Sequence, residues 1–171
     1  MNYEHQNWKC PIKRIPILVG SLLNLKSLSI GKGKDLTILP DEIGNLDSIV
    51  VLEIDETSIR ALPDRIGELK LIEKLKMKKC RYLTSLPEFI KRLLRLTTLF
   101  LFEAKITELC KSTKTNLIMI KLTNCKVLYK LPGSIGKLKS LHHLFMDDTG
   151  VTKLTESFGM LSGIVYEKEA S

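Results

Sequence analysis

An apolar residue followed by proline recurs along this 171-residue chain at a nearly constant interval, and this repeat constrains the fold more than any other feature. The pairs are Ile15-Pro16, Leu39-Pro40, Leu62-Pro63, Leu86-Pro87 and Leu131-Pro132, while Leu109-Cys110 and Leu154-Thr155 occupy the same slot without proline. Successive pairs lie 22 to 24 residues apart. Periods of this length are typical of solenoids, in which one repeat cannot bury its apolar face alone and stacks on its neighbours.

Two apolar spacings alternate within each repeat, and each predicts one element. Behind the proline, apolar residues lie three positions apart and a glycine often follows, as in Ile43-Gly44, which suits a 3-10 turn or a short α-helix. Further along, apolar residues alternate with period 2, as in Leu52 and Ile54, which indicates a strand with one buried face. We therefore predict an α/β fold, a right-handed solenoid with a parallel sheet on its concave face and short helical or 3-10 segments on its convex face.

The composition is that of one folded domain with an aliphatic core. Hydrophobic residues make up 44% and charged residues 27%, which argues against disorder, and aromatic residues make up only 6%. We expect a repeat domain over residues 12–164 with about six repeats, a partial N-terminal repeat over 1–11 and a C-terminal tail over 165–171. No apolar run approaches the roughly 20 residues that a membrane span needs.

The residues that follow the predicted strands alternate in type and in their spacing to the next apolar residue. Cys80-x-x-Leu83 and Cys125-x-x-Leu128 alternate with Thr57-x-Ile59 and Thr149-x-Val151. Over about residues 12–164 the chain resembles a leucine-rich-repeat array, and the Cys/Thr alternation is similar to the repeats of plant intracellular nucleotide-binding leucine-rich-repeat disease-resistance proteins of the TIR type. The Leu-Pro-x-x-Ile-Gly segment, which we call the leg, is shared with the plant intracellular Ras-group leucine-rich-repeat proteins. This scaffold family in signalling is the alternative to the immune-receptor family.

The resemblance to immune receptors implies a non-enzymatic module that recognises a protein and helps to hold the receptor inactive. The implied partners are a pathogen effector, a guarded host protein or the receptor's own nucleotide-binding domain, and the implied location is the cytoplasm or the nucleus. The chain lacks the Gly-x-x-x-x-Gly-Lys-Ser/Thr motif, so we expect no cofactor. We interpret the chain as the repeat region of a longer receptor, or as a truncated relative of one.

The residues that alternate with the buried strand positions are the candidates for partner binding. They are Glu53, Asp55, Lys76, Lys78, Phe100, Phe102, Lys121, His143, Phe145 and Asp147. Neighbouring strands lie about 4.8 Å apart, which predicts three charge pairs, Glu53/Lys76, Asp55/Lys78 and Glu56/Lys79. Exposed phenylalanines rimmed by charges have the makeup of a protein-binding hot spot, although a neighbouring domain could also cover them.

Other chemistries receive less support from the sequence. His142, His143, Asp147 and Asp148 cluster, but adjacent histidines leave a strand in different directions and no further ligand completes a site, so we expect no metal. A core filled with aliphatic side chains leaves no pocket for a catalytic triad, which argues against an enzyme. The net charge of +8 keeps nucleic-acid binding as a minor alternative, although acidic residues interrupt the basic ones.

One repeat is irregular. Leu117 lies only seven positions after Cys110, whereas Ile72 lies nine positions after Pro63, and the run from Lys111 to Thr115 is polar. We predict a local kink or a loose outer loop there, and both a functional hinge and relaxed selection would explain it.

Overall fold

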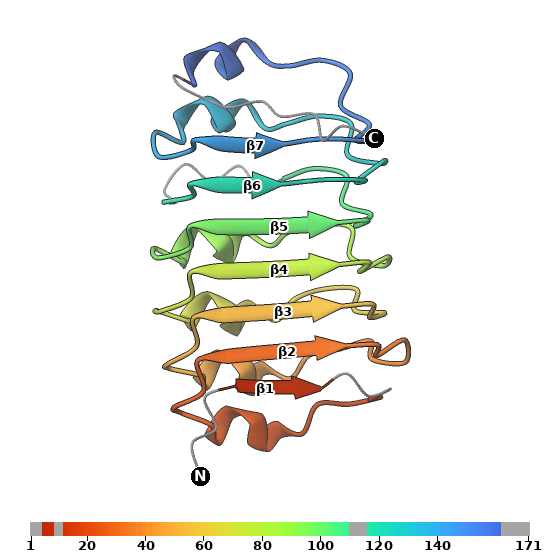
Figure 1. Ribbon diagram of the computed structural model, residues 1–171, viewed down its shortest axis with the longest axis vertical. Helices are drawn as coiled ribbons and strands as arrows, with labels where there is room; N and C mark the ends of the chain where they lie inside the picture. Colours follow the sequence, from red (N-terminus) through yellow and green to blue (C-terminus); the bar gives the residue numbers. More distant parts are fainter. Residues whose placement is uncertain (1–4, 9–11, 110–115, 162–171) are drawn as a thin grey trace.

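In the described part of the chain, seven parallel strands stacked in sequence order form one face of the molecule. The computed structural model describes residues 5–8, 12–109 and 116–161. The strands are β1 (His5–Trp8), β2 (Ser27–Gly31), β3 (Val51–Asp55), β4 (Lys74–Lys78), β5 (Thr98–Phe102), β6 (Met119–Lys121) and β7 (His143–Phe145). Each strand pairs with the next one along the chain, so the sheet order is β1-β2-β3-β4-β5-β6-β7 (Figure 1). The prediction of a parallel sheet with one strand per repeat is confirmed.

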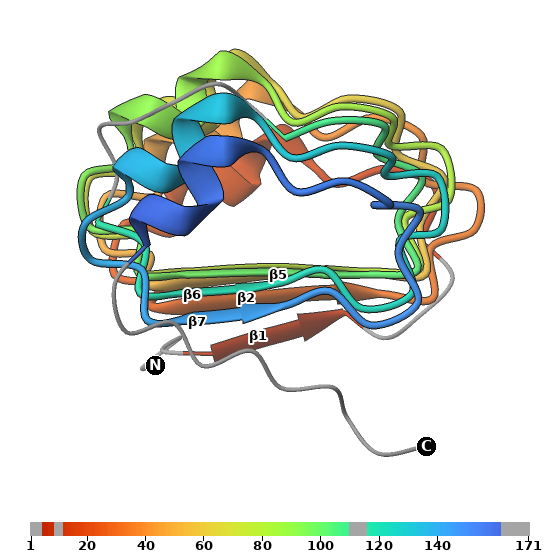
Figure 2. The ribbon, with the colours of Figure 1, turned by 90° about the horizontal axis from the view of Figure 1, so that it is seen from above.

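Short 3-10 helices form the opposite layer (Figure 2). They are η1 (Ile17–Ser21), η2 (Asp41–Asn45), η3 (Asp64–Glu68), η4 (Glu88–Arg92), η5 (Gly133–Lys137) and η6 (Glu156–Met160). The sequence left open whether this leg is 3-10 or α-helical, and every helix in the described part of the chain is 3-10 and five residues long. None of these helices has the length or the apolar character to cross a membrane.

The three-residue spacing of the leg follows from its hydrogen bonds. In the third repeat the Ile66 amide donates to the Pro63 carbonyl at 3.0 Å, the Leu69 amide donates to the Ile66 carbonyl at 3.1 Å, and the Ile72 amide donates to the Leu69 carbonyl at 3.4 Å. Bonds from residue i+3 to residue i define a 3-10 turn and place every third side chain on the same side. The motif Pro-x-x-Ile-x-x-Leu therefore turns its apolar residues inward, and proline supplies a φ of −65° at the N-cap.

The core is one continuous stack of aliphatic side chains between the two layers. Buried strand residues from successive repeats lie side by side in the register of the sheet. Among those with no exposed surface are Leu28, Ile30, Leu52, Ile54, Leu75, Met77, Leu101 and Leu144. Each fully buried aliphatic side chain contributes about 1.5–3 kcal/mol, so the stack is the main stabilising term.

The glycine in the leg allows close packing between adjacent coils, the successive turns of the solenoid. A Cβ at Gly20 would lie 2.6 Å from the Glu42 carbonyl oxygen, and a Cβ at Gly67 would lie 2.8 Å from the Phe89 Cβ. Both distances are too short for a real contact. Glycine therefore lets the 3-10 helices of adjacent coils pack at close range.

One position shortly after the end of each strand from β2 to β7, which we call the ladder position, links neighbouring coils. Its residues are Gly33, Thr57, Cys80, Ala104, Cys125 and Thr149. The Cys80 thiol donates to the Ile54 carbonyl of the preceding coil at 3.2 Å and lies 3.6 Å from the Thr57 hydroxyl oxygen. The Cys125 thiol reaches the Leu101 carbonyl at 3.7 Å. A thiol is a weak donor, so these inter-coil bonds are weak.

The residue before each ladder position adopts a left-handed backbone. These residues are Lys32, Glu56, Lys79, Glu103, Asn124 and Asp148, with φ between 50° and 61°. The strain is offset by hydrogen bonds between coils, since the Glu56 amide donates to the Lys78 carbonyl at 2.8 Å and the Lys79 amide donates to the Phe102 carbonyl at 2.7 Å. Asn and Asp tolerate this conformation best, so Lys and Glu gave no sequence signal for it.

The structure adds one strand that the sequence did not predict and differs from one expectation, and a further expectation lies outside the described residues. The sequence did not predict strand β1, which pairs in parallel with β2. Leu154 occupies the slot of the buried Leu-Pro leucines but is 52% exposed, because within the described residues only one neighbouring coil packs against its own. The predicted kink over Lys111 to Thr115 lies outside the described residues.

Candidate functional site

The outward-pointing side chains of β2 to β7 form a continuous surface that we call the sheet face. Its central column, in which each residue is the direct register partner of the next, is Ser29, Glu53, Lys76, Phe100, Lys121 and Phe145. Five of the predicted binding residues therefore lie in one line, because a regular period puts equivalent strand positions opposite each other.

The first half of the sheet face and the edge beside it carry ion pairs. Lys76 Nζ lies 2.6 Å from Glu53 Oε1, and Lys79 Nζ lies 3.3 Å from Glu56 Oε1, as predicted. These side chains are between 30% and 39% exposed, so each pair contributes no more than about 1 kcal/mol. The pairs neutralise two of the lysines at and beside β4.

The third predicted pair does not form an ion pair. Asp55 and Lys78 are register partners, but Lys78 Nζ lies over the Phe102 ring, 5.4 Å from its centroid. Burial raises the pKa of Asp55, and the charges of Glu53 and Glu56 raise it further. The charge of Lys78 and a hydrogen bond from its backbone lower the pKa, but they do not reverse the upward shift. Folding therefore disfavours the ionised form of Asp55 relative to its neutral form.

The second half of the sheet face is aromatic. Lys121 Nζ lies between two rings, 5.8 Å from the Phe100 centroid and 5.3 Å from the Phe145 centroid. The His143 ring stacks on Phe145 with centroids 6.3 Å apart and planes 8° apart. Together with the Lys78–Phe102 contact these residues form the aromatic-lysine patch, which consists of Lys78, Phe100, Phe102, Lys121, His143 and Phe145.

The phenylalanines of this patch are less exposed than the sequence suggested. Phe100, Phe102 and Phe145 are only partly exposed, because lysine ammonium groups and the His143 ring lie against them. A cation held over an aromatic ring is stabilised by about 0.5–1 kcal/mol at such a surface. The patch is therefore preorganised, with its side chains held in place by one another.

Unsatisfied polar atoms adjoin the patch at the ends of β6 and β7. Thr123 Oγ1, Asn124 Oδ1 and Asp147 Oδ2 are buried atoms without a hydrogen-bond partner. Asp147 was a predicted binding residue and follows β7, outside the paired register. The sequence gave no signal for Thr123 and Asn124, because their unmet hydrogen bonds result from the packing of two coils.

Nothing in the described part of the chain assembles a metal site, since no group of three or more His, Cys, Asp or Glu side chains converges there. The His142 ring instead contacts the Ser140 carbonyl oxygen through Nδ1 at 2.7 Å. His142 and His143 therefore make a local hydrogen bond and a ring contact, respectively.

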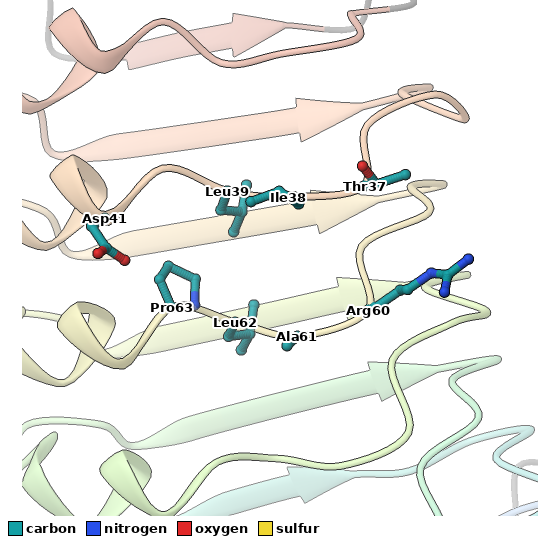
Figure 3. Close-up of a pocket in the computed structure, with 8 residues that line it drawn as sticks. All are labelled: Thr37, Ile38, Leu39, Asp41, Arg60, Ala61, Leu62 and Pro63. Carbon is teal, nitrogen blue, oxygen red and sulfur yellow. The ribbon is translucent and has the colours of Figure 1, made fainter.

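An apolar groove lies away from the sheet face, on the segments that lead into η2 and η3 (Figure 3). It is lined by Thr37, Ile38, Leu39, Asp41, Arg60, Ala61, Leu62 and Pro63. Ile38 is 74% exposed, whereas Leu39 and Leu62 belong to the core. The groove contains one acid and one base, so it lacks the convergent polar groups that a small-molecule site needs.

Similarity to known proteins is found at the level of the fold. No protein-family profile and no curated protein sequence matches the chain. A leucine-rich-repeat protein of Leptospira interrogans superposes with a TM-score of 0.61 and 24% identity over 95% of this chain and 53% of its own. The leucine-rich-repeat domain of the type III effector XopL gives a TM-score of 0.55 and 18% identity, covering 95% of this chain and 75% of that domain.

A plant peptide hormone receptor also matches. RGFR1, solved in complex with RGF2, gives a TM-score of 0.58 and 24% identity over 92% of this chain and 30% of its own. The chain thus spans about half the length of the Leptospira protein and less than a third of the hormone receptor. At these identities the similarity concerns the backbone alone. Together with the parallel sheet and the 3-10 legs, it establishes that the chain folds as a leucine-rich-repeat solenoid.

Proposed function

We propose that the chain is a non-enzymatic protein-binding module that contacts its partner through the sheet face. The aromatic-lysine patch carries this proposal, because it joins partly exposed rings with positioned cations. Aromatic side chains surrounded by polar groups dominate the binding energy of protein interfaces. RGFR1, which is similar to this chain in fold, was solved in complex with RGF2, and this supports a protein or peptide partner.

The finer proposal concerns the biological setting. We infer that the chain is the recognition and autoinhibitory repeat region of a plant intracellular immune receptor, or a truncated relative, and that it acts in the cytoplasm or nucleus. The alternation of Cys80 and Cys125 with Thr57 and Thr149 at the ladder position supports this assignment. The partner would be a pathogen effector, a guarded host protein or the receptor's own nucleotide-binding domain.

Proximity labelling in plant cells tests both levels of the proposal. The chain is fused to a biotin ligase and compared with a double variant of the patch, Phe100→Ser with Phe145→Ser. The matched control is Ile17→Ser with Leu18→Ser, which removes apolar side chains that are 66% and 73% exposed on the helical face. We expect labelled proteins that include a nucleotide-binding module, present with the wild type and the control and absent with the patch variant.

The outcomes separate the alternatives. A labelled set that depends on the phenylalanines but contains no nucleotide-binding module would support protein binding and favour a Ras-group scaffold over a receptor. A labelled set unaffected by the patch variant would contradict the sheet face as the binding surface. The melting temperature of each variant shows whether a loss of labelling reflects binding or folding, because Phe100 and Phe145 are partly buried.

A further inference from the structure

Basic residues recur at one position on the edge of the solenoid where the strands end. The position directly after the ladder position holds Lys34, Ser58, Arg81, Lys105, Lys126 and Gly150. The four basic side chains among these are all exposed. The repeat register therefore aligns cations that are scattered in the sequence, on an edge distinct from the sheet face.

On this edge, the coils that contain β2, β3 and β4 form a groove. It lies behind the ends of β2, β3 and β4, and we call it the flank groove. Its lining includes Lys34, Glu56, Ser58, Lys79, Arg81 and Tyr82. Three consecutive coils thus contribute side chains to one surface hollow.

The backbone holds the walls of the flank groove in place. Glu56 and Lys79 are both left-handed residues, and their amides bond to the following coil at 2.8 Å and 2.7 Å. The Ser58 hydroxyl donates to the Lys34 carbonyl oxygen, which ties the second coil to the first. These inter-coil bonds fix the spacing from which Lys34, Lys79 and Arg81 extend.

The charge of the flank groove is unbalanced. Lys34, Lys79 and Arg81 face a single lining carboxylate, Glu56, which pairs with Lys79 at 3.3 Å. Glu103 approaches Arg81 only at 3.8 Å, and the Arg81 side chain is 66% exposed, so most of its five donors remain accessible to a ligand. The Arg60 guanidinium lies 5.9 Å from the centroid of the Tyr82 ring and adds a further cation beside the groove.

A second polar groove shows that this imbalance is not general. The groove between η1, η2, η3 and η4 is lined by Asp47, Glu68, Lys70 and Arg92, together with neutral residues, and its charges cancel. The lining of the flank groove sums to a net charge of +2 from three cations and one carboxylate.

We propose that the flank groove binds a phosphate monoester group. Such a group carries a charge of about −1.5 to −2 at pH 7, which matches the surplus of the groove, whereas a single carboxylate would leave one positive charge uncompensated. Arg81 offers the planar fork that holds two phosphate oxygens, and Lys34 and Lys79 act as point charges on either side. Ser58 supplies no donor, because its hydrogen already bonds to the Lys34 carbonyl.

Titration of the ¹⁵N-labelled protein with O-phospho-L-serine, followed by NMR, tests the proposal. We expect shifts confined to the amides around residues 56–58 and 79–82. The double variant Lys34→Gln with Arg81→Gln should weaken binding at least about tenfold, because it removes two charge-assisted contacts. Lys105→Gln with Lys126→Gln is the matched control, since it removes two exposed cations from the same repeat position outside the groove, and it should change affinity less than about twofold.

Three results would overturn the proposal. The first is equal weakening by the two double variants, which would mean diffuse attraction to a basic surface. The second is equal affinity for dimethyl phosphate, which carries one charge and would show that the groove does not select a dianion. The third is tighter binding of duplex DNA than of phosphoserine, with dependence on Lys105 and Lys126, which would indicate a nucleic-acid surface along the edge.

Titrations with other phosphate compounds identify the class of ligand that supplies the phosphate group. Tighter binding of a phosphoserine heptapeptide than of free phosphoserine would assign the groove to a phosphorylated polypeptide, and equal binding of inorganic phosphate would assign it to small phosphate ligands. Affinity for the monoester should fall between pH 7.5 and pH 5.5, because the second pKa of the phosphate is about 6. The patch variant Phe100→Ser with Phe145→Ser should leave this binding unchanged, so failure here and failure at the sheet face are distinguishable.

Discussion

A Cβ atom on Gly44 would lie 2.4 Å from the carbonyl oxygen of Arg65 in the next coil. The same coil boundary is closed by a hydrogen bond of 2.7 Å from the Arg65 guanidinium to the Asn45 side-chain oxygen. The atoms of Arg65 in this contact are its carbonyl group and its Cβ, which move only with the backbone, so no flexible side chain could move aside. Glycine at this position sets how closely η2 and η3 approach.

Gly44→Ala should therefore destabilise the protein by about 1–3 kcal/mol, the cost of overpacking a tight contact. Gly133→Ala is the matched control, because no described atom beyond its chain neighbours and its own helix backbone lies within 4 Å of a Cβ at Gly133, and it should be neutral or stabilising by up to about 1 kcal/mol. Urea unfolding followed by circular dichroism measures both. Equal effects of the two substitutions would contradict close helix packing as the role of glycine.

The left-handed residues allow a test with one substitution made at two positions. Lys32 has a φ of 59°, whereas Lys74 lies in the extended strand β4, and both side chains are exposed. Lys32→Gly should stabilise the protein or leave it unchanged, because glycine removes a strain of about 1–2 kcal/mol. Lys74→Gly should cost about 0.5–1 kcal/mol. We expect the urea unfolding midpoint of Lys32→Gly to be higher than that of Lys74→Gly. A lower midpoint for Lys32→Gly would show that the backbone at Lys32 is not strained.

The Cys80 thiol should be unreactive in the folded protein. It is 1% exposed, and burial raises its pKa to about 11 from a model-compound value of 9.0. At pH 8 about one thiol in a thousand is then ionised, and the reactive thiolate is also inaccessible. Iodoacetamide at pH 8, followed by peptide mapping, should label Cys80 only after denaturation. Labelling of the native protein at the rate of a free thiol would contradict this burial.

The same shift predicts a loss of stability in alkali. Because the folded pKa is above the unfolded one, the contribution of Cys80 is fully present below pH 9 and is lost as the pH rises toward 11. Between pH 8 and pH 10 the wild type should lose about 1 kcal/mol more than Cys80→Ala, for which this titration is absent. Urea midpoints at several pH values provide the measurement, and parallel curves for the two proteins would rule out the effect.

Asp55 should be a site where removing a charge stabilises the protein. Burial is the main cause of its raised pKa, followed by the charge of Glu53, so the neutral form is favoured on folding. Its stabilising contribution is therefore present at low pH and lost as the pH rises above the ordinary carboxyl range. Asp55→Asn should raise the urea midpoint at pH 7 and have little effect at pH 3. Asp35→Asn, at an exposed aspartate in another coil, is the control and should change neither midpoint.

The period of the chain was sufficient to predict the fold. Repeats of 22 to 24 residues put Leu52, Leu75 and Leu99 in equivalent strand positions, and the structure pairs them as direct partners. The same periodicity placed Glu53 opposite Lys76 and Phe100 next to Lys121. Predictions of this kind succeed because a buried aliphatic pattern dictates register, and register fixes which surface residues are neighbours.

The directions of the surface side chains depended on local competition between contacts. Lys78 has both Asp55 and Phe102 as register partners, and its ammonium group lies over the ring. The sequence names both neighbours but does not rank them, because the energies of an exposed ion pair and a cation–π contact are similar. The stacking of His143 on Phe145 is a further outcome of this kind.

By itself the sequence determined the solenoid, its strand positions, its aliphatic core and the line of candidate residues on the sheet face, since all of these follow from one repeated spacing. Only the tertiary structure decided the left-handed residues at the coil edge, the close packing at Gly44 and the flank groove built by Lys34, Lys79 and Arg81. Each of these depends on how far one coil lies from the next and on the direction of individual side chains. Those distances are set by packing between repeats, which the pattern within a single repeat does not contain.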